Sequence, residues 1–122
     1  MKIISFAWTT PALLAGRKTV TRRAWSPRWA ATFKAGELVA AYDRQPRFRG
    51  HQVATIRLTQ APYVESTAFA PEDDWEGEGF AYLTDTGAKV DGLEPAVLWR
   101  AWHLQPQLLY VVRFELVEVV KS

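Results

Sequence analysis

The segment from Leu108 to Val119 constrains the fold of this chain more than any other stretch of its sequence. Leucine, valine and aromatic side chains recur there at every second position, with Arg113 and Glu115 between them; the recurring residues are Leu108, Tyr110, Val112, Phe114 and Leu116. A period of two is that of a β-strand with one face in a hydrophobic core. A strand of this length needs neighbours on both sides, so we predict that it lies at the centre of a sheet.

The rest of the chain reads as further strands and short helices. The predicted strands are Ile3–Phe6, 19–25, Leu38–Tyr42 and 51–63, the last with Ala54, Ile56 and Leu58 inward. The predicted helices are one that starts at Pro11 after an N-cap at Thr10 and stops at Gly16, one at 27–33, and an apolar one at 95–104. We expect one domain, residues 1–122, of the α+β class and mainly β. Its core would be a partly open barrel with short helices packed at the barrel ends.

Composition excludes several other classes of protein. The sequence has no cysteine and only two histidines, His51 and His103, which leaves no thiolate site and too few ligands for zinc. Sixteen aromatic residues, six of them tryptophan, argue against a disordered chain. No apolar run approaches the roughly 20 residues that span a bilayer, and residues 1–6 show no cleavable signal pattern. We therefore expect a cytoplasmic protein with no metal, no bound cofactor and no membrane partner.

Charge is distributed unevenly along the chain. Residues 1–60 carry 11 Lys and Arg against two acidic residues, whereas residues 61–122 carry four against 11. A basic first half could present a positive surface to RNA or to a nucleotide. A charge-polarised surface that binds no ligand is the alternative.

The basic residues concentrate in the segment from Gly16 to Arg23. It holds the cations Arg17, Lys18, Arg22 and Arg23, together with two threonines, at a predicted helix-to-strand junction. A tight turn at Gly16 would bring backbone N–H groups and cationic side chains to one place, as an anionic or polar ligand requires. An exposed strand with threonine chosen for β-propensity would have the same sequence.

The order of motifs resembles that of ASCH domains, a family of PUA-like β-barrels. The resemblance begins with Ile4-Ser5-Phe6 and the basic motif, which runs from Leu14 to Arg23. It continues through 34–39, 54–58, Glu78-Gly79-Phe80 and 110–116, and so covers essentially the whole chain. It implies a barrel with a basic cleft that recognises RNA or a modified nucleoside.

The resemblance also implies an activity. Small amidohydrolases of this family deacetylate N4-acetylcytidine to cytidine with a lysine, a threonine and a glutamate, which fall on Lys18, Thr21 and Glu78. Other ASCH proteins are ribonucleases acting on single-stranded RNA, or bind RNA without catalysis. Membership of the fold does not decide among these functions.

The three residues make chemical sense by themselves. A threonine hydroxyl becomes a nucleophile when a base takes its proton, and crowding by Arg17, Arg22 and Arg23 would lower the pKa of Lys18 toward that role. Glu78 would protonate the leaving amine or orient Lys18. Lys18 and Thr21 converge only if Lys18 precedes the strand. The neighbouring carboxylates, Glu72, Asp73, Asp74 and Glu76, read as a solvated helix face.

Binding residues are predicted around the same motif. Arg17, Lys18, Arg22 and Arg23 are expected to share one concave surface with at least one residue of the loop that carries Arg44, Arg47 and Arg49. Trp8 and Trp25 are candidate platforms for stacking a base. We assign Trp99 and Trp102 to the core, because tryptophans at helical spacing in an apolar segment usually pack there.

Overall fold

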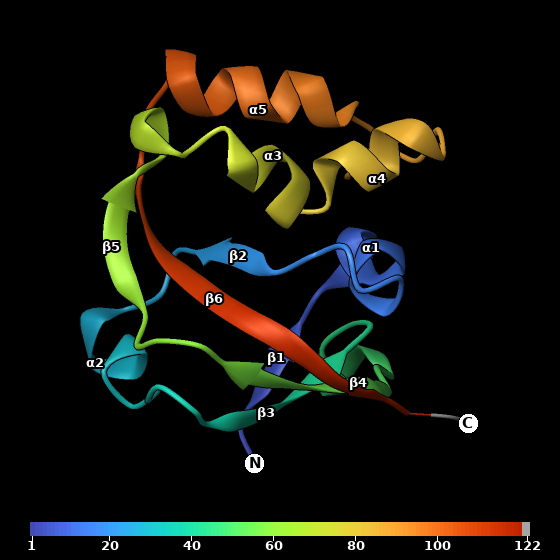
Figure 1. The fold of residues 1–122 in the computed structure, drawn as a ribbon, viewed down its shortest axis with the longest axis vertical. Coiled ribbons are helices and arrows are strands. Elements are labelled where there is room, and N and C mark those ends of the chain that lie inside the picture. Colours follow the sequence, from blue (N-terminus) through green and yellow to red (C-terminus); the bar gives the residue numbers. More distant parts are fainter. Residues whose placement is uncertain (121–122) are drawn as a thin grey trace.

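A long, bent strand organises the computed structural model, which describes residues 1–120. This strand, β6 (Leu108–Val119), pairs antiparallel with β2 (Val20–Arg23) and β5 (Tyr63–Ser66) through its first half and with β4 (Gln52–Leu58) through its second. Beyond β4 lies β3 (Leu38–Tyr42), antiparallel to it, and then β1 (Ile3–Ser5), parallel to β3. The result is a mixed sheet that curls into an open half-barrel (Figure 1). The predicted central position of the final strand is confirmed.

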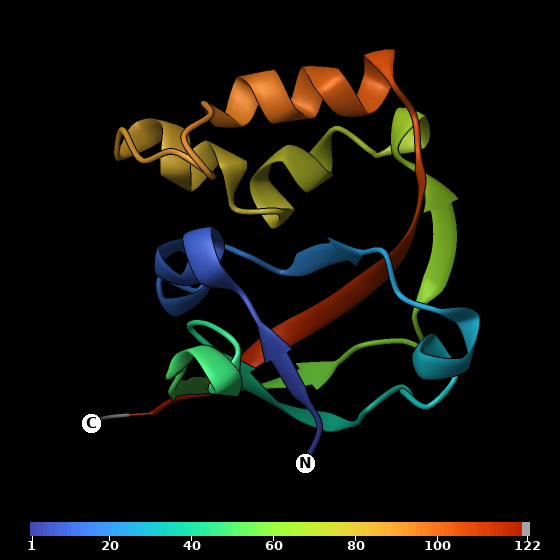
Figure 2. The same ribbon diagram turned by 180° about the vertical axis from the view of Figure 1, so that it is seen from behind.

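Short helices connect and cover the strands. The α-helices are α1 (Thr10–Leu14), α2 (Pro27–Ala30), α3 (Asp73–Gly77), α4 (Phe80–Asp85) and α5 (Pro95–Leu104), and the 3-10 turns are η1 (Ala7–Thr9), η2 (Pro46–Phe48) and η3 (Thr67–Phe69). Helices α3, α4 and α5 gather on one side of the barrel, beyond β2, and α1 packs against α4 (Figures 1 and 2). The predicted fold class, α+β with a partly open barrel and short helices, is confirmed.

The core lies inside the half-barrel. Its buried residues come from β1, β3, β4, β6, α1 and the segments that follow β1 and α2, and they include Ile4, Phe6, Leu13, Phe33, Val39, Ile56, Leu58, Val112 and Phe114. Ala54, Ile56 and Leu58 point inward as predicted, whereas Arg57 between them is exposed.

Several element boundaries differ from the prediction. The expected strand 51–63 is two strands, β4 and β5, because a turn at 59–62 breaks it. Helix α1 begins at Thr10 rather than Pro11, with Thr9 in the N-cap position, and no side chain caps it. It ends at Leu14, and Gly16 follows with a φ of 74°, the left-handed conformation typical of a helix stop.

The alternation along β6 predicts its second half better than its first. Leu108 is exposed, whereas Leu109 and Val111, which the pattern placed outward, are buried. The physical reason is that β6 is covered on both faces where it passes between the half-barrel core and the layer of helices. A simple one-sided alternation therefore holds only where one face meets water.

Helix α5 is less buried than its composition predicts. Trp99 and Trp102 are half-buried and pack on Phe80 and Trp75 outside the main core, and Leu104 is 73% exposed. The prediction that the two tryptophans fill the core is therefore wrong in part: they belong to an outer aromatic cluster. Within residues 1–120, no helix has the length and apolar character needed to cross a membrane.

Candidate active site

Two glycines bring the helical layer into contact with the basic motif. The N–H of Thr19 donates to the carbonyl of Gly77 at 2.7 Å, and a Cβ built on Gly77 would lie 3.0 Å from Val20 Cγ1. A Cβ on Gly79 would lie 2.6 Å from Ala12 Cβ, closer than real side chains approach. Glu78, between them, is thereby held against the residues just before β2.

Lys18 and Glu78 form a buried pair at this contact. Lys18 Nζ donates to the Glu78 carbonyl at 2.7 Å and to Glu78 Oε1 at 3.1 Å. Both residues are almost fully enclosed, Lys18 with 2% and Glu78 with 3% of its surface exposed. Burial lowers the pKa of Lys18; Glu78 opposes this effect, and Arg22 and Arg23 add to it. Lys18 lies two residues before β2 begins at Val20, so it precedes the strand as predicted.

A chain of alternating charges continues from Glu78. Arg22 Nη1 donates to Glu78 Oε2 at 2.7 Å and its Nη2 to Asp74 Oδ2 at 2.6 Å. Arg113 donates to both oxygens of Asp74 at 2.9 Å, and Arg22 also reaches Glu65. Each buried charge thus has an opposite neighbour, which is the condition for keeping charges out of water.

Thr21 is tied to a second arginine. Its Oγ1 accepts a hydrogen bond from Arg23 Nε at 3.0 Å, while Arg23 Nη2 donates to the carbonyl of Ser5 at 2.6 Å. Thr21 is 4% exposed. Because its oxygen is an acceptor here, its own proton is free to be given to a base. The hydrogen bonds of Lys18 go to Glu78 and that of the Thr21 hydroxyl comes from Arg23, so the amine and the hydroxyl share no direct hydrogen bond.

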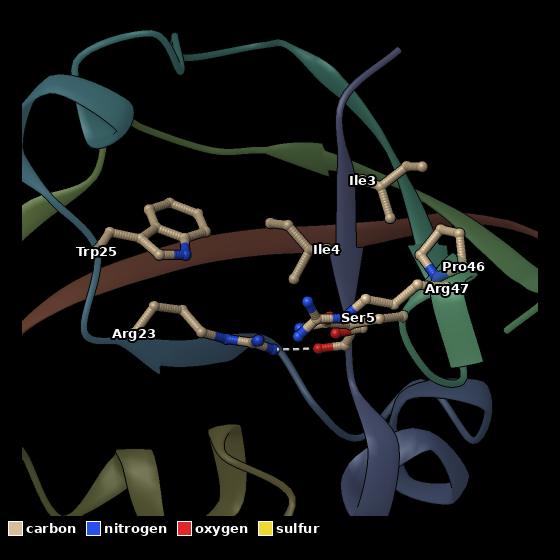
Figure 3. Close-up of a pocket in the computed structure, with 8 residues that line it drawn as sticks. Ile3, Ile4, Ser5, Arg23, Trp25, Pro46 and Arg47 are labelled. Carbon is tan, nitrogen blue, oxygen red and sulfur yellow. Dashed lines mark hydrogen bonds between the residues drawn. The ribbon is translucent and has the colours of Figure 1, made fainter.

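A pocket of about 380 Å³ opens where the half-barrel fails to close, between β1 and β2. We call it the seam pocket; it is lined by Ile3, Ile4, Ser5, Arg23, Trp25, Gln45, Pro46 and Arg47 (Figure 3). The Trp25 ring stacks on Phe33 with centroids 4.7 Å apart and 11° between the planes, which fixes the indole in place. Arg23 connects the pocket to Thr21, because it lines the pocket and donates to the Thr21 hydroxyl.

The predicted binding residues do not share a single surface. Lys18 and Arg22 are buried among carboxylates, and Arg17 is exposed and paired with Glu76. Of the four cations in the basic motif, Arg23 is the one that lines the seam pocket, where it meets Arg47 of the predicted loop. The expectation that all four share one concave surface is therefore wrong, although Arg23 shares one with Arg47: the acidic second half of the chain neutralises the other three.

The remaining candidates lie outside the seam pocket. Arg44 and Arg49 are exposed on the same loop as Arg47 but are absent from the pocket's lining. Trp8 is 56% exposed on η1 and is likewise absent from it, whereas Trp25 contributes to it.

Asp74 and Arg113 are site residues that the sequence analysis missed. Asp74 was expected on a solvated helix face but is buried, because Arg22 and Arg113 both donate to it. Its signal in the sequence is the spacing of four to Glu78, which places both carboxylates on one side of a helix turn. Arg113 could have been noticed as the lone cation of the described final strand.

No metal centre is evident in the described part of the chain. Among residues 1–120, no three Asp, Glu, His or Cys side chains come close enough together to hold a metal ion. The polar groups at Lys18 instead satisfy one another, so the chemistry that this arrangement supports is proton transfer and hydrogen bonding.

Comparison with known proteins identifies a similar fold. No family model matches the sequence, and no curated protein matches it either. The crystal structure of protein EF3133 from Enterococcus faecalis V583, described under the family model DUF984, is similar, with a TM-score of 0.57. The match covers 95% of this chain and 74% of that one, at 20% sequence identity. The likeness is one of fold.

Proposed function

We propose that this chain is an ASCH-type amidohydrolase that removes the acyl group from an N4-acylated cytidine. The observation that carries the proposal is the enclosed Lys18, bonded to Glu78, together with the Thr21 hydroxyl, which accepts from an arginine that lines a nucleoside-sized pocket. A pocket of about 380 Å³ lies within the range of small-ligand sites. The ordered ASCH-like motifs and the half-barrel fold add support.

The base would be Lys18 in its neutral form. Burial lowers the pKa of this amine, so the amine can accept a proton. Its hydrogen bond to Glu78 Oε1 holds it in place, and Arg22 holds the other carboxylate oxygen. Glu78 is thus the orienting carboxylate of the two roles considered for it.

The reaction would run in two balanced steps. Thr21 Oγ1 attacks the acyl carbon and its proton passes to Lys18; the carbon–nitrogen bond then breaks, and the cytosine amine takes that proton as it leaves. Water then attacks the threonine ester, with Lys18 again as base, and releases the carboxylic acid and the free hydroxyl. Arg23 sits beside Thr21 and in the pocket wall, and so links substrate binding to the nucleophile.

The test is release of cytidine and acetate from N4-acetylcytidine, followed by chromatography. Thr21→Val removes the hydroxyl with little change of shape and should reduce kcat/KM by about 100-fold or more, whereas Thr21→Ser should retain activity. Lys18→Met should be equally damaging, and Lys89→Met, an exposed lysine, is the matched control. Circular dichroism checks that each variant is folded.

Two results would reject the proposal. One is wild-type protein that leaves N4-acetylcytidine intact under all conditions. The other is a folded Thr21→Val variant with full activity, since the hydroxyl would then have no part in the reaction. Binding of single-stranded RNA by an inactive wild-type protein would instead support a binding module.

A further inference from the structure

The seam pocket has a charged end that the proposed hydrolysis does not use. Arg47, on η2, extends toward Ser5 and Arg23 from the side of the pocket opposite Trp25 (Figure 3). Arg23 and Arg47 are the charged residues among the eight that line the pocket, and the lining includes no aspartate or glutamate. The pocket therefore attracts an anion.

The two arginines differ in how far they are already engaged. Arg23 donates from Nε to the Thr21 hydroxyl and from Nη2 to the Ser5 carbonyl. Arg47 lies over the ring of Phe48, 4.8 Å from its centroid, and forms no ion pair with any residue from 1 to 120. Arg47 is thus the cation available to a ligand.

The loop that carries Arg47 is held in shape by hydrogen bonds within the loop. Asp43 Oδ1 accepts from the N–H of His51 at 2.8 Å, and the Gln45 carbonyl accepts from the N–H groups of Phe48 and Gly50. A Cβ on Gly50 would lie 1.8 Å from the Arg44 carbonyl oxygen, so the loop closes only with glycine at this position. A preorganised loop loses little backbone entropy when its side chain binds an anion.

The edge of β1 adds polar backbone groups to the same pocket. Ala40 N–H donates to the Lys2 carbonyl, and Phe6 N–H donates to the Tyr42 carbonyl. The backbone groups of Lys2 and Phe6, which flank β1, therefore point toward β3. In a parallel pair alternate residues direct their N–H and C=O groups to opposite sides. The backbone N–H and C=O groups of Ile3 and Ser5 therefore face the open seam between β1 and β2, and both residues line the pocket there.

We infer that the η2 end of the seam pocket is a phosphate subsite, in which Arg47 binds the phosphate of a cytidine nucleotide. The base lies on Trp25 and the ribose runs along β1. Trp25 and Arg47 stand at opposite sides of the pocket, as the two ends of a nucleotide require (Figure 3). That the nucleotide is an acylated cytidine rests on the proposed function; the phosphate subsite rests on the pocket itself.

The activity experiment compares N4-acetylcytidine with its 5′-monophosphate at low ionic strength. Wild-type protein should have a kcat/KM about 10- to 100-fold higher for the monophosphate, the gain expected from a charge-assisted hydrogen bond to arginine. In Arg47→Gln the ratio of the two kcat/KM values should fall close to one. Arg100→Gln on α5 removes the same charge away from the pocket and should keep the wild-type ratio. Equal rates for both substrates in the wild type, or a preference that survives Arg47→Gln, would overturn the subsite.

Short oligonucleotides decide where the phosphate comes from. An oligonucleotide with N4-acetylcytidine in its interior should be hydrolysed as fast as the monophosphate if the subsite takes an RNA phosphodiester. It should be resistant if the subsite takes a free nucleotide. In either case the preference should depend on Arg47.

A binding experiment separates failure of the subsite from failure of the proposed function. If no substrate is hydrolysed, the amidohydrolase proposal fails, and titration of tryptophan fluorescence with CMP and with cytidine tests the subsite alone. CMP should bind at least about tenfold more tightly than cytidine to the wild type, and equally to Arg47→Gln. Equal affinities in the wild type would overturn the inference.

Discussion

Lys18 shows how a residue's chemistry depends on where its side chain ends. On an exposed strand this amine would be a solvated cation, which is the alternative that the sequence left open. Here it is enclosed and donates to Glu78, whose second oxygen is held by Arg22. Burial lowers the pKa of Lys18, and Arg23 and Arg22 lower it further against the opposing effect of Glu78.

This shift predicts the pH dependence of activity. If Lys18 is the base, it works in its neutral form, so kcat/KM for N4-acetylcytidine should rise with pH and level off above the lowered pKa of Lys18. Removing a cation that lowers the pKa of Lys18 should therefore shift the pH profile of kcat/KM. Arg22→Met removes a neighbouring cation, and the midpoint should shift to higher pH. A profile that falls with rising pH would contradict the role of Lys18 as base.

At the scale of elements, the Gly77-Glu78-Gly79 segment decides whether the site forms. Helix α3 ends at Gly77 and α4 begins at Phe80, so the site carboxylate stands at the junction of two short helices. Gly79 has a φ of 89° and leaves no room for a Cβ beside Ala12, which is buried on α1. Neither helix could bring Glu78 to Lys18 without this close approach.

A glycine pair tests that statement. Gly79→Ala should destabilise the fold by about 1–3 kcal/mol beyond the cost of its positive φ, because the new methyl group meets Ala12. Gly87→Ala is the matched control: its φ is 74°, but a Cβ there meets no atom within 4 Å. Urea denaturation of both variants measures the difference.

The double variant completes the test. Ala12→Gly opens space at the contact and should recover part of the stability lost in Gly79→Ala, beyond simple addition of the two effects. Equal stabilities for the Gly79 and Gly87 variants would mean that the contact with Ala12 is unimportant.

At the scale of the whole molecule, the two oppositely charged halves of the sequence meet inside the fold. Arg22 from the basic half and Arg113 from β6 both donate to Asp74 of the helical layer. Burial by itself would raise the pKa of Asp74, but the hydrogen bonds from Arg113 and Arg22 outweigh it, and the pKa lies below its usual value. The charge asymmetry thus joins the helices to the half-barrel.

Low pH should weaken the contact between the helices and the half-barrel that Asp74 makes with Arg22 and Arg113. Because the pKa of Asp74 is lower in the folded state than in the unfolded state, its contribution to stability is complete above about pH 4 and is lost as the pH falls through the lowered value. Asp74→Asn leaves Arg113 without a carboxylate partner and Arg22 with Glu78 and Glu65 alone, and it should cost about 3–5 kcal/mol at pH 7.

Thermal melting from pH 7 to pH 2 tests this prediction. The melting curves of the wild type and Asp74→Asn should be far apart at neutral pH and should converge in acid. Asp91→Asn, at an exposed loop position, is the control and should follow the wild type throughout. A constant difference between wild type and Asp74→Asn at all pH values would show that the carboxylate charge has no part in the stability.

The sequence by itself determined the features that depend on local pattern. The alternation in 108–119 predicted the central strand, and Gly16 marked the end of α1, because side-chain period and backbone conformation are set within a few residues. The resemblance to ASCH domains pointed to Lys18 and Glu78, which the fold brings into contact across 60 residues of sequence. Only the tertiary structure decided that Asp74 is buried, that Arg17, Lys18 and Arg22 are neutralised, and that Arg23 and Arg47 meet at the open seam. The physical reason is that a side chain's charge is known from its identity, whereas its burial and its partners depend on segments far away in the chain.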